Sequence, residues 1–339
     1  MPETNITYPK LADKPAGSKH RYSKRTIDAH MHWYPQEFVD LMVKKGPANG
    51  AVMGMDAHGN PSVESVPGCT QSSNMRKTMT NVDDIIRDMD KRRIDTYALS
   101  MTNPLMYWAP PAFGLELAAA HNDACVEMNR KYPDRFYGCI ILPMQDVKLA
   151  CQELERMAKF PCMRSVFIAE HINGKNLHEK EFWPVYEQCE KLNLPIFLHP
   201  MMINNERMKQ FYLVNICGNP FDTALAACHL IFGGVLDAFP KLEISLPHAG
   251  GVLPILRGRS DSCVGADSYV VFLFRAEGLF RISYRLIPDL GCTDQTDSTQ
   301  FLFQRFVGLA TDVAVSVHYK VREADVIDVT DPALSYMVP

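Results

Sequence analysis

The sequence lacks several features that are typical of membrane proteins and nucleic-acid-binding proteins. It contains no uninterrupted apolar run of about 18 residues, the minimum for a membrane-spanning helix. It has no excess of basic residues, because the formal net charge is -4 and the sequence pI is about 6.3. A site for nucleic acid or for an anionic membrane surface is therefore not expected, and a small-molecule partner fits better.

Cysteine pairs with the spacing of metal or redox motifs are also missing. The ten cysteines include no CxxC motif, and Cys139, Cys189 and Cys228 lie in apolar segments, where a reduced thiol behaves as a small hydrophobic group. Residues 1–25 are polar and lack the apolar core of a secretory signal. We expect a cytoplasmic protein that begins with a polar extension.

From Thr26 onward, short apolar segments alternate with longer amphipathic ones, as in a chain of repeated βα units. The 339 residues, of which 47% are hydrophobic, are enough for one barrel of about 250 residues with insertions. We therefore predict a single α/β domain, a TIM-type (β/α)8 barrel, over residues 26–339. The expected strands are 26–32, 96–101, 136–142, 163–169, 195–199 and 242–248, and the expected helices are 81–93, 112–131, 146–159, 179–192 and 219–232.

Two parts of the chain depart from this alternation. Residues 33–80 show no clear helical period and contain the turn sequence His-Gly-Asn at 58–60, so we expect an inserted cap segment with a hairpin over the barrel mouth. Residues 260–339 form a divergent C-terminal part. Within it, the apolar stretch 269–287 is the candidate for strand seven and residues 306–312 for strand eight.

His30 and His32 stand two residues apart at the end of the first expected strand. Side chains two apart on a strand share a face, which in a barrel can be the interior, so two imidazoles converge there. Neutral imidazole is a common ligand of zinc and other transition metals. Two surface or hydrogen-bonded core histidines are an equally reasonable interpretation of this pair taken alone.

His199 and His248 favour a metal site over surface or hydrogen-bonded core histidines. Each ends an apolar segment, in Ile-Phe-Leu-His-Pro and Ser-Leu-Pro-His-Ala-Gly-Gly. In a parallel barrel all such strand ends open on one mouth, where the active sites of this fold are built. Asp312, which ends Val-Gly-Leu-Ala-Thr-Asp, is a candidate oxygen ligand and proton acceptor, although a helix cap explains it equally well.

Three segments carry a resemblance to a known family: residues 27–32, residues 164–200 with Glu-His-Ile-Asn-Gly-Lys-Asn-Leu and Phe-Trp-Pro-Val-Tyr, and residues 248–259. Together they resemble the amidohydrolase-related family that includes aminocarboxymuconate-semialdehyde decarboxylase and the resorcylate and carboxyvanillate decarboxylases. The resemblance covers roughly residues 26–259 and implies a metal-dependent enzyme with a barrel fold.

The resemblance also implies roles for individual residues. It assigns one divalent metal ion to four ligands, namely His30, His32, His199 and Asp312. It makes His248 a further active-site histidine, and it pairs Arg259 with a substrate carboxylate, often across the interface of a homodimer. Residues 313–314 are Val-Ala where the family usually has Tyr-Pro, and residues 260–305 lack the family pattern.

One metal is expected, because residues 164–169 contain no lysine that could bridge two ions. Zinc is the expected ion from the ligand types, with manganese as the alternative. Glu170 and His171 follow the fourth strand and are expected to orient a loop or the substrate. The aromatic residues near the strand ends are candidates for stacking on a planar substrate or for plain packing, and they are Trp33, Tyr34, Tyr107 and Trp108.

We therefore expect non-oxidative decarboxylation of an aromatic or unsaturated carboxylic acid. In this reaction His248 would move a proton, Asp312 would bind the metal and assist a water, Arg259 would pair with a carboxylate and His171 would contact the substrate. The same site is compatible with hydrolysis of a C–C or amide bond, since that reaction also needs a Lewis acid and a proton shuttle. A barrel that binds a ligand without catalysis is the third hypothesis.

Overall fold

The computed structural model describes residues 26–68, 73–201, 205–253, 255–256, 270–274 and 280–284, the last two ranges as backbone only. Its strands are β1 (Ile27–His32), β2 (Val52–Met55), β3 (Pro61–Ser65), β4 (Ser73–Asn74), β5 (Thr96–Ser100), β6 (Phe136–Ile141), β7 (Met163–Ala169), β8 (His171–Ile172), β9 (Lys175–Asn176), β10 (Ile196–His199), β11 (Ile244–Ser245), β12 (Val270–Phe274) and β13 (Phe280–Tyr284). Its α-helices are α1 (Gln36–Lys45), α2 (Lys77–Thr80), α3 (Val82–Arg92), α4 (Pro111–Lys131), α5 (Val147–Met157), α6 (Trp183–Leu192), α7 (Asn219–Phe232) and α8 (Val235–Ala238). Short helical turns are η1 (Pro47–Asn49), η2 (Lys180–Phe182), η3 (Glu206–Met208), η4 (Val214–Gly218) and η5 (His248–Gly250).

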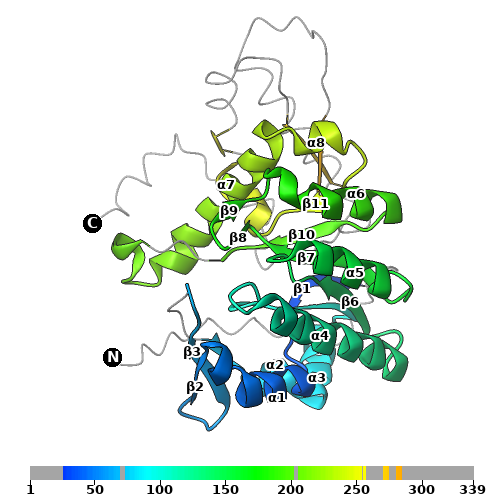
Figure 1. Cartoon of the computed structure of the whole chain (residues 1–339). Coiled ribbons are helices and arrows are strands. Elements are labelled where there is room, and N and C mark those ends of the chain that lie inside the picture. Colours follow the sequence, from blue (N-terminus) through cyan, green and yellow to red (C-terminus); the bar gives the residue numbers. More distant parts are fainter. Residues whose placement is uncertain are drawn as a thin grey trace, which may run out of the picture.

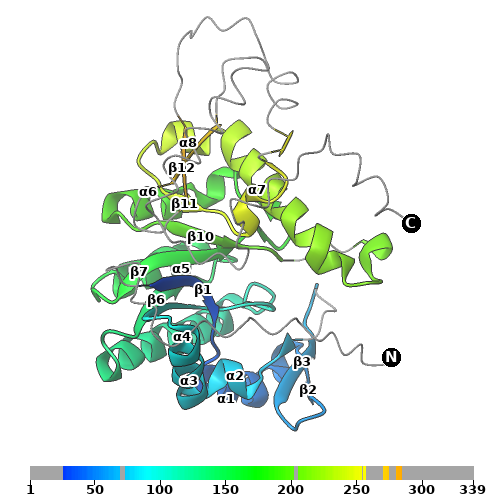
Figure 2. The ribbon, with the colours of Figure 1, turned by 180° about the vertical axis from the view of Figure 1, so that it is seen from behind.

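A six-stranded sheet with the order β1-β5-β6-β7-β10-β11 forms the centre of the molecule. All five neighbouring pairs are parallel. Because parallel neighbours need a crossover connection, a helix lies between each pair in the chain, from α3 before β5 to α7 before β11. Figures 1 and 2 show α4, α5 and α6 covering one side of the sheet. This is the parallel arrangement of a TIM-type barrel, seen over six strands.

The polar residues at the helix ends explain where two of these helices begin and end. The Asn81 side chain accepts a hydrogen bond from the Asp84 N–H at 3.0 Å and begins α3, as the sequence predicts. Arg93, in the left-handed conformation, ends the same helix. Asp146 begins α5 in the same way, accepting from the Leu149 N–H at 3.1 Å. The predicted α/β alternation up to α7 is confirmed.

The segment after β1 contains a helix that the sequence analysis missed. Helix α1 buries Phe38, Val39 and Met42 against the core, so the prediction that residues 33–80 lack helical periodicity is wrong. The predicted hairpin is confirmed: β2 and β3 pair antiparallel around a turn in which Gly59 has a φ of 75°, and β4 adds a third strand. Its position over a barrel mouth stays a prediction.

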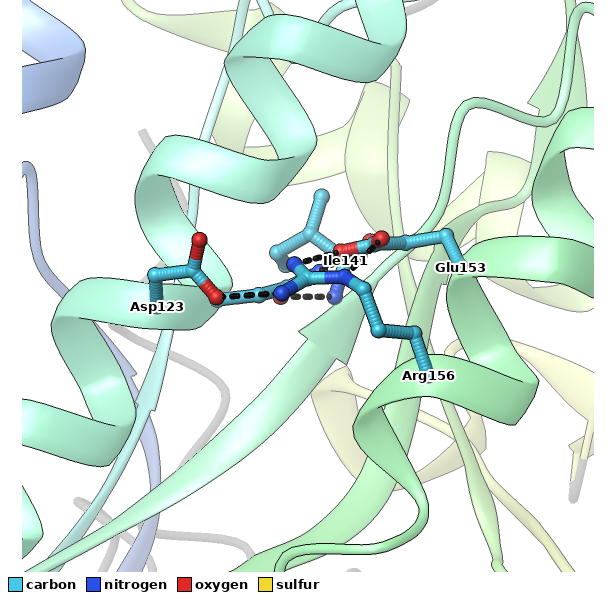
Figure 3. A network of polar contacts seen from close by, with 5 residues as sticks. Asp123, Ile141, Glu153 and Arg156 are labelled. Atoms are coloured by element: carbon cyan, nitrogen blue, oxygen red, sulfur yellow. Dashed lines mark hydrogen bonds and ion pairs between the residues drawn. The ribbon is translucent and has the colours of Figure 1, made fainter.

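A polar network with Asn122 and Glu153 buried at its centre joins α4, α5 and β6 (Figure 3). The Asn122 amide donates to the Ile141 carbonyl at 2.9 Å and accepts from the Ile141 N–H at 2.8 Å. It also donates to Glu153 at 2.6 Å. Arg156 neutralises Glu153 with two hydrogen bonds of 2.8 Å and reaches Asp123 at 2.6 Å. The network therefore ties both covering helices to a central strand.

The cysteines behave as the sequence suggested. All seven cysteines in the described part of the chain are free, and Cys139 and Cys189 are buried, whereas Cys228 is half-buried. Burial raises the pKa of the Cys139 thiol to about 11, so this group stays protonated at neutral pH. Within the described ranges, no helix combines the length and apolar character needed to cross a membrane.

The C-terminal strands differ from the expectation. Strand 242–248 is reduced to the two residues of β11. The stretch 269–287, expected to contribute one parallel strand, instead forms the antiparallel pair β12-β13, which is separate from the six-stranded sheet. The expected eighth strand, 306–312, lies outside the described residues.

Candidate metal centre

The first two candidate ligands, His30 and His32, lie at the end of β1. The pairing of β1 with β5 shifts register between Asp28 and Met31, and the Asp28 carboxylate accepts a hydrogen bond from the His30 N–H at 3.0 Å. Such bulges are common beside active sites, where they redirect side chains. The two imidazole centroids lie 4.7 Å apart.

His199, at the end of β10, completes the cluster. Its ring centroid lies 4.9 Å from that of His32 and 5.7 Å from that of His30. Strands β1 and β10 are separated by three other strands, so a flat sheet would place them roughly 19 Å apart. The rings meet because the sheet curves, as it does in a barrel.

The nitrogen atoms of these rings suit a metal ion. One ligand atom from each of the three histidines lies within 4.8 Å of the others. The Nδ1–H of His199 donates to the Pro200 carbonyl at 2.8 Å, which makes Nε2 the acceptor nitrogen, with the Thr102 hydroxyl 3.4 Å away. The Nδ1 of His32 is buried without a hydrogen-bond partner in the described part of the chain. A neutral imidazole has one acceptor nitrogen, and three such nitrogens in one cluster fit a divalent transition metal.

The electrostatics of the cluster keep its histidines neutral. Burial, followed by the neighbouring His30, lowers the pKa of His32 to about 3. Burial lowers the pKa of His199 well below its usual value, and His32 and His30 lower it further. Burial also lowers the pKa of His30. The rings are thus in the unprotonated form that ligates metal at neutral pH.

His248 follows β11 and lies near the cluster, close enough to lower the pKa of His199 and to have its own pKa lowered by His30. It stands outside the three-histidine group. Four consecutive residues from His248 to Gly251 have positive φ, a conformation that is costly for His248 and Ala249. Strain of this kind clusters at functional sites. Burial and the nearby His30 lower the pKa of His248 to about 4.

Comparison with known proteins places this chain in a family. The family model described as Amidohydrolase matches residues 27–263, which is more than half of the chain. The chain belongs to the amidohydrolase family.

Among curated proteins, this amidohydrolase is similar to a 2-amino-3-carboxymuconate-6-semialdehyde decarboxylase from Dictyostelium discoideum. The two are 34% identical over 236 residues, which cover 69% of this chain and 65% of the relative. The match therefore spans slightly less than two thirds of the relative's length.

Crystal structures show the same similarity. A 5-carboxyvanillate decarboxylase from Sphingomonas paucimobilis is 25% identical, with a TM-score of 0.58 and coverage of 70% of this chain and 71% of that chain. A dihydroxybenzoic acid decarboxylase from Polaromonas, with bound manganese and the inhibitor 2-nitroresorcinol, is 26% identical, with a TM-score of 0.54 and coverage of 69% of this chain and 68% of that chain.

Thr223, Glu170 and Asp222 form a polar group that contacts His248 through Thr223. Of these three residues, the sequence analysis named only Glu170. Thr223 contacts His248 Nδ1 at 2.9 Å and Glu170 Oε1 at 2.6 Å. Burial, together with a smaller contribution from the neighbouring Asp222, raises the pKa of Glu170 to about 9. Burial likewise raises the pKa of Asp222. The position of Glu170 directly after β7 was the only sequence signal for this group.

The remaining candidate residues have mixed outcomes. His171 begins the β8-β9 hairpin and accepts a hydrogen bond from the Gly174 N–H at 3.2 Å, so it orients this loop. Arg259 and Asp312 lie outside the described residues. Of the four aromatic residues considered for stacking, three are buried in the core and serve packing, and these are Trp33, Tyr34 and Tyr107; Trp108 is half-buried.

Proposed function

We propose that this amidohydrolase is a metal-dependent, non-oxidative decarboxylase of an aromatic or unsaturated carboxylic acid. The observation that carries the proposal is the convergence of His30, His32 and His199, with His248 near them, in a member of this family. The named relatives act on carboxylic acids of this kind. Because they are decarboxylases, hydrolysis of a C–C or amide bond is not favoured.

The proposed cofactor is one divalent metal ion. His30, His32 and His199 would hold it, with Asp312 as the proposed fourth ligand. Imidazole donors favour zinc, and the bound manganese of the Polaromonas relative makes manganese the alternative. When bound, a divalent cation supplies positive charge that offsets the negative charge developing as CO2 leaves.

The residues of the chain account for the other requirements of the reaction. The bond between the carboxyl carbon and the neighbouring carbon breaks, its electron pair stays on that neighbouring carbon, and a proton replaces the carboxyl group. His248 is the proposed proton carrier, since it is the fourth histidine at the site and is held by Thr223. Arg259 would pair bidentately with a substrate carboxylate, and His171 would contact the substrate through its loop.

The segment after β1 is the proposed cap of the site. The Ser73 hydroxyl of β4 donates to the Asn103 carbonyl, and the Tyr34 hydroxyl donates to the same carbonyl at 2.6 Å. These bonds tie the three-stranded antiparallel sheet to the loop after β5, close to Thr102, which lies 3.4 Å from His199 Nε2. We further propose a homodimer, through the role of Arg259, and a cytoplasmic location.

Metal analysis and CO2 release test the proposal together. The purified protein should contain one ion per chain by elemental analysis, and His199→Ala should lose it. His178→Ala is a matched control, because His178 is a half-buried histidine stacked on His229 at 4.8 Å, outside the cluster. The metal-loaded protein should release CO2 from aminocarboxymuconate semialdehyde, a dihydroxybenzoate or 5-carboxyvanillate. A metal-free protein, or a loaded one that cleaves amides and no carboxylate, would refute the proposal.

A further inference from the structure

The hydroxyl of Thr223 is the centre of a buried hydrogen-bonded group beside the metal centre. Thr223 is 0% exposed, and its Oγ1 lies 2.6 Å from Glu170 Oε1, 2.9 Å from His248 Nδ1 and 3.0 Å from the Asn219 carbonyl oxygen. The three partners come from three places in the chain: the end of β7, the turn after β11 and the first turn of α7. Their meeting is a product of the tertiary fold.

Proton counting assigns a direction to the contact with His248. A threonine hydroxyl has one proton to donate and two lone pairs to accept. The Asn219 carbonyl can only accept, so the single Thr223 proton goes either to it or to Glu170 Oε1. In the first case the neutral Glu170, whose pKa is raised to about 9, donates its own proton to Thr223. Since the only Thr223 proton is in use in either case, the contact with His248 is satisfied when the Nδ1–H of His248 donates to Thr223 Oγ1.

We propose that Thr223 and Glu170 are positioning residues that hold His248 as the Nδ1–H tautomer, so that Nε2 is the atom that accepts and returns the proton. The role of Nε2 in accepting and returning a proton rests on the proposed function. The assignment of the tautomer itself rests on the hydrogen bonds. Which nitrogen of a histidine carries its proton is set by the partner of the other nitrogen.

The backbone around His248 holds the ring in place against Thr223. His248 and Ala249 both have positive φ, and Gly251 has a φ of 62° with no room for a side chain. A Cβ at Gly251 would lie 2.0 Å from the Pro220 carbonyl oxygen, in the same turn of α7 that precedes Thr223. The turn that carries His248 is therefore seated directly on the helix that carries its partner.

Glu170 connects this group to the metal centre. Its N–H donates to the His199 carbonyl at 2.9 Å, and its side chain is 2% exposed. One residue thus contacts the backbone of a proposed metal ligand and, through Thr223, the ring of the proposed proton carrier. A buried carboxyl group is costly in free energy, which favours a positioning role over a purely structural one.

Nitrogen-15 NMR of the histidine rings tests the inference without a substrate. In the zinc-loaded protein, which is diamagnetic, His248 is assigned by its loss in His248→Asn. We expect a protonated Nδ1 and an unprotonated Nε2 in the wild type and in Thr223→Ser. In Thr223→Val the Nδ1 signal should change toward the unprotonated type. A wild-type His248 that is protonated on Nε2, or a tautomer unchanged in Thr223→Val, overturns the inference.

A matched control separates this effect from general loss of packing. Thr96 is also 0% exposed and donates to a carbonyl, that of Asp134, at 3.0 Å. Thr96→Val removes a comparable hydrogen bond far along the chain from His248, and we expect the His248 signals to be unchanged in this variant. A change in His248 as large as that caused by Thr223→Val would mean that the tautomer reports packing alone.

Kinetics provide the second readout once a substrate is identified. Thr223→Val should lower kcat by roughly 100-fold, at the lower end of what general acid–base catalysis contributes, with little change in KM. Thr223→Ser should restore most of kcat. If decarboxylation fails for every substrate while the NMR result holds, the proposed function is wrong and the tautomer assignment stands. If decarboxylation is found and the tautomer is wrong, only this inference falls.

Discussion

The Asn122 network of Figure 3 provides a stability prediction whose size follows from its hydrogen bonds. Asn122 is 0% exposed and makes three hydrogen bonds, two with the Ile141 backbone and one with Glu153. In Asn122→Ala the Ile141 N–H and carbonyl lose their partner in a buried place where water does not replace it. At about 1 kcal/mol per bond, plus the cost of the unpaired groups, the free energy of unfolding should fall by about 3 to 5 kcal/mol.

Urea unfolding followed by circular dichroism measures this change, with Asn129→Ala as the control. Asn129 lies on the same helix and also donates to backbone carbonyls, those of Pro133 and Phe136, but it is only half-buried. Water can replace its bonds, so the control should lose about 1 kcal/mol. Equal losses in the two variants would refute the reasoning, because burial would then not decide the cost.

The remaining predictions concern pH, backbone strain and metal. His121 is fully buried, and burial lowers its pKa from 6.5 to about 4, so its folded form binds fewer protons than its unfolded form below pH 6.5. Stability should therefore fall by about 3 kcal/mol as the pH drops from 6.5 to 4, and urea unfolding of His121→Gln should lack this part of the loss. Gly251→Ala should lower the unfolding free energy by at least about 1 kcal/mol, measured by thermal denaturation, because the new Cβ meets the Pro220 carbonyl at positive φ. Zinc at 100 times its dissociation constant should stabilise the wild type by about 2.7 kcal/mol in a melting assay and leave His199→Ala unchanged.

The parts of the fold that the sequence predicts are those with local causes. Helix α3 has Asn81 at its start and acidic residues in its first turn, and β7 contains the apolar run 166–169, so both were found. Helix α1 was missed because no side chain caps it: Pro35 precedes it and makes no side-chain hydrogen bond. Strand β11 ends earlier than expected because Pro247 has no N–H to pair and His248 leaves the extended conformation at positive φ.

The candidate site likewise contains residues that the sequence predicts and residues that only the structure reveals. His30, His32 and His199 could be found from the sequence because each ends an apolar strand, and parallel strand ends share one edge of the sheet. Thr223 could not be found, because it lies inside the apolar helix α7, where threonine has no distinctive pattern. Its contacts with Glu170 depend on how β7 and α7 pack, which the spacing of residues along the chain does not encode.

The curvature that brings His199 to β1 also bears on the order of folding. His32 and His199 lie far apart in the chain, and the strands that carry them are not neighbours in the sheet. Bringing His32 and His199 together closes a long loop, and the entropic cost of this closure exceeds the stabilisation from one contact between them. We therefore expect the intervening strands to assemble first. For the same reason, we expect the proposed metal ion to bind late, after β5, β6 and β7 have paired. Chelation would then loosen the join between the first strand and the second half of the sheet and leave the sheet itself formed.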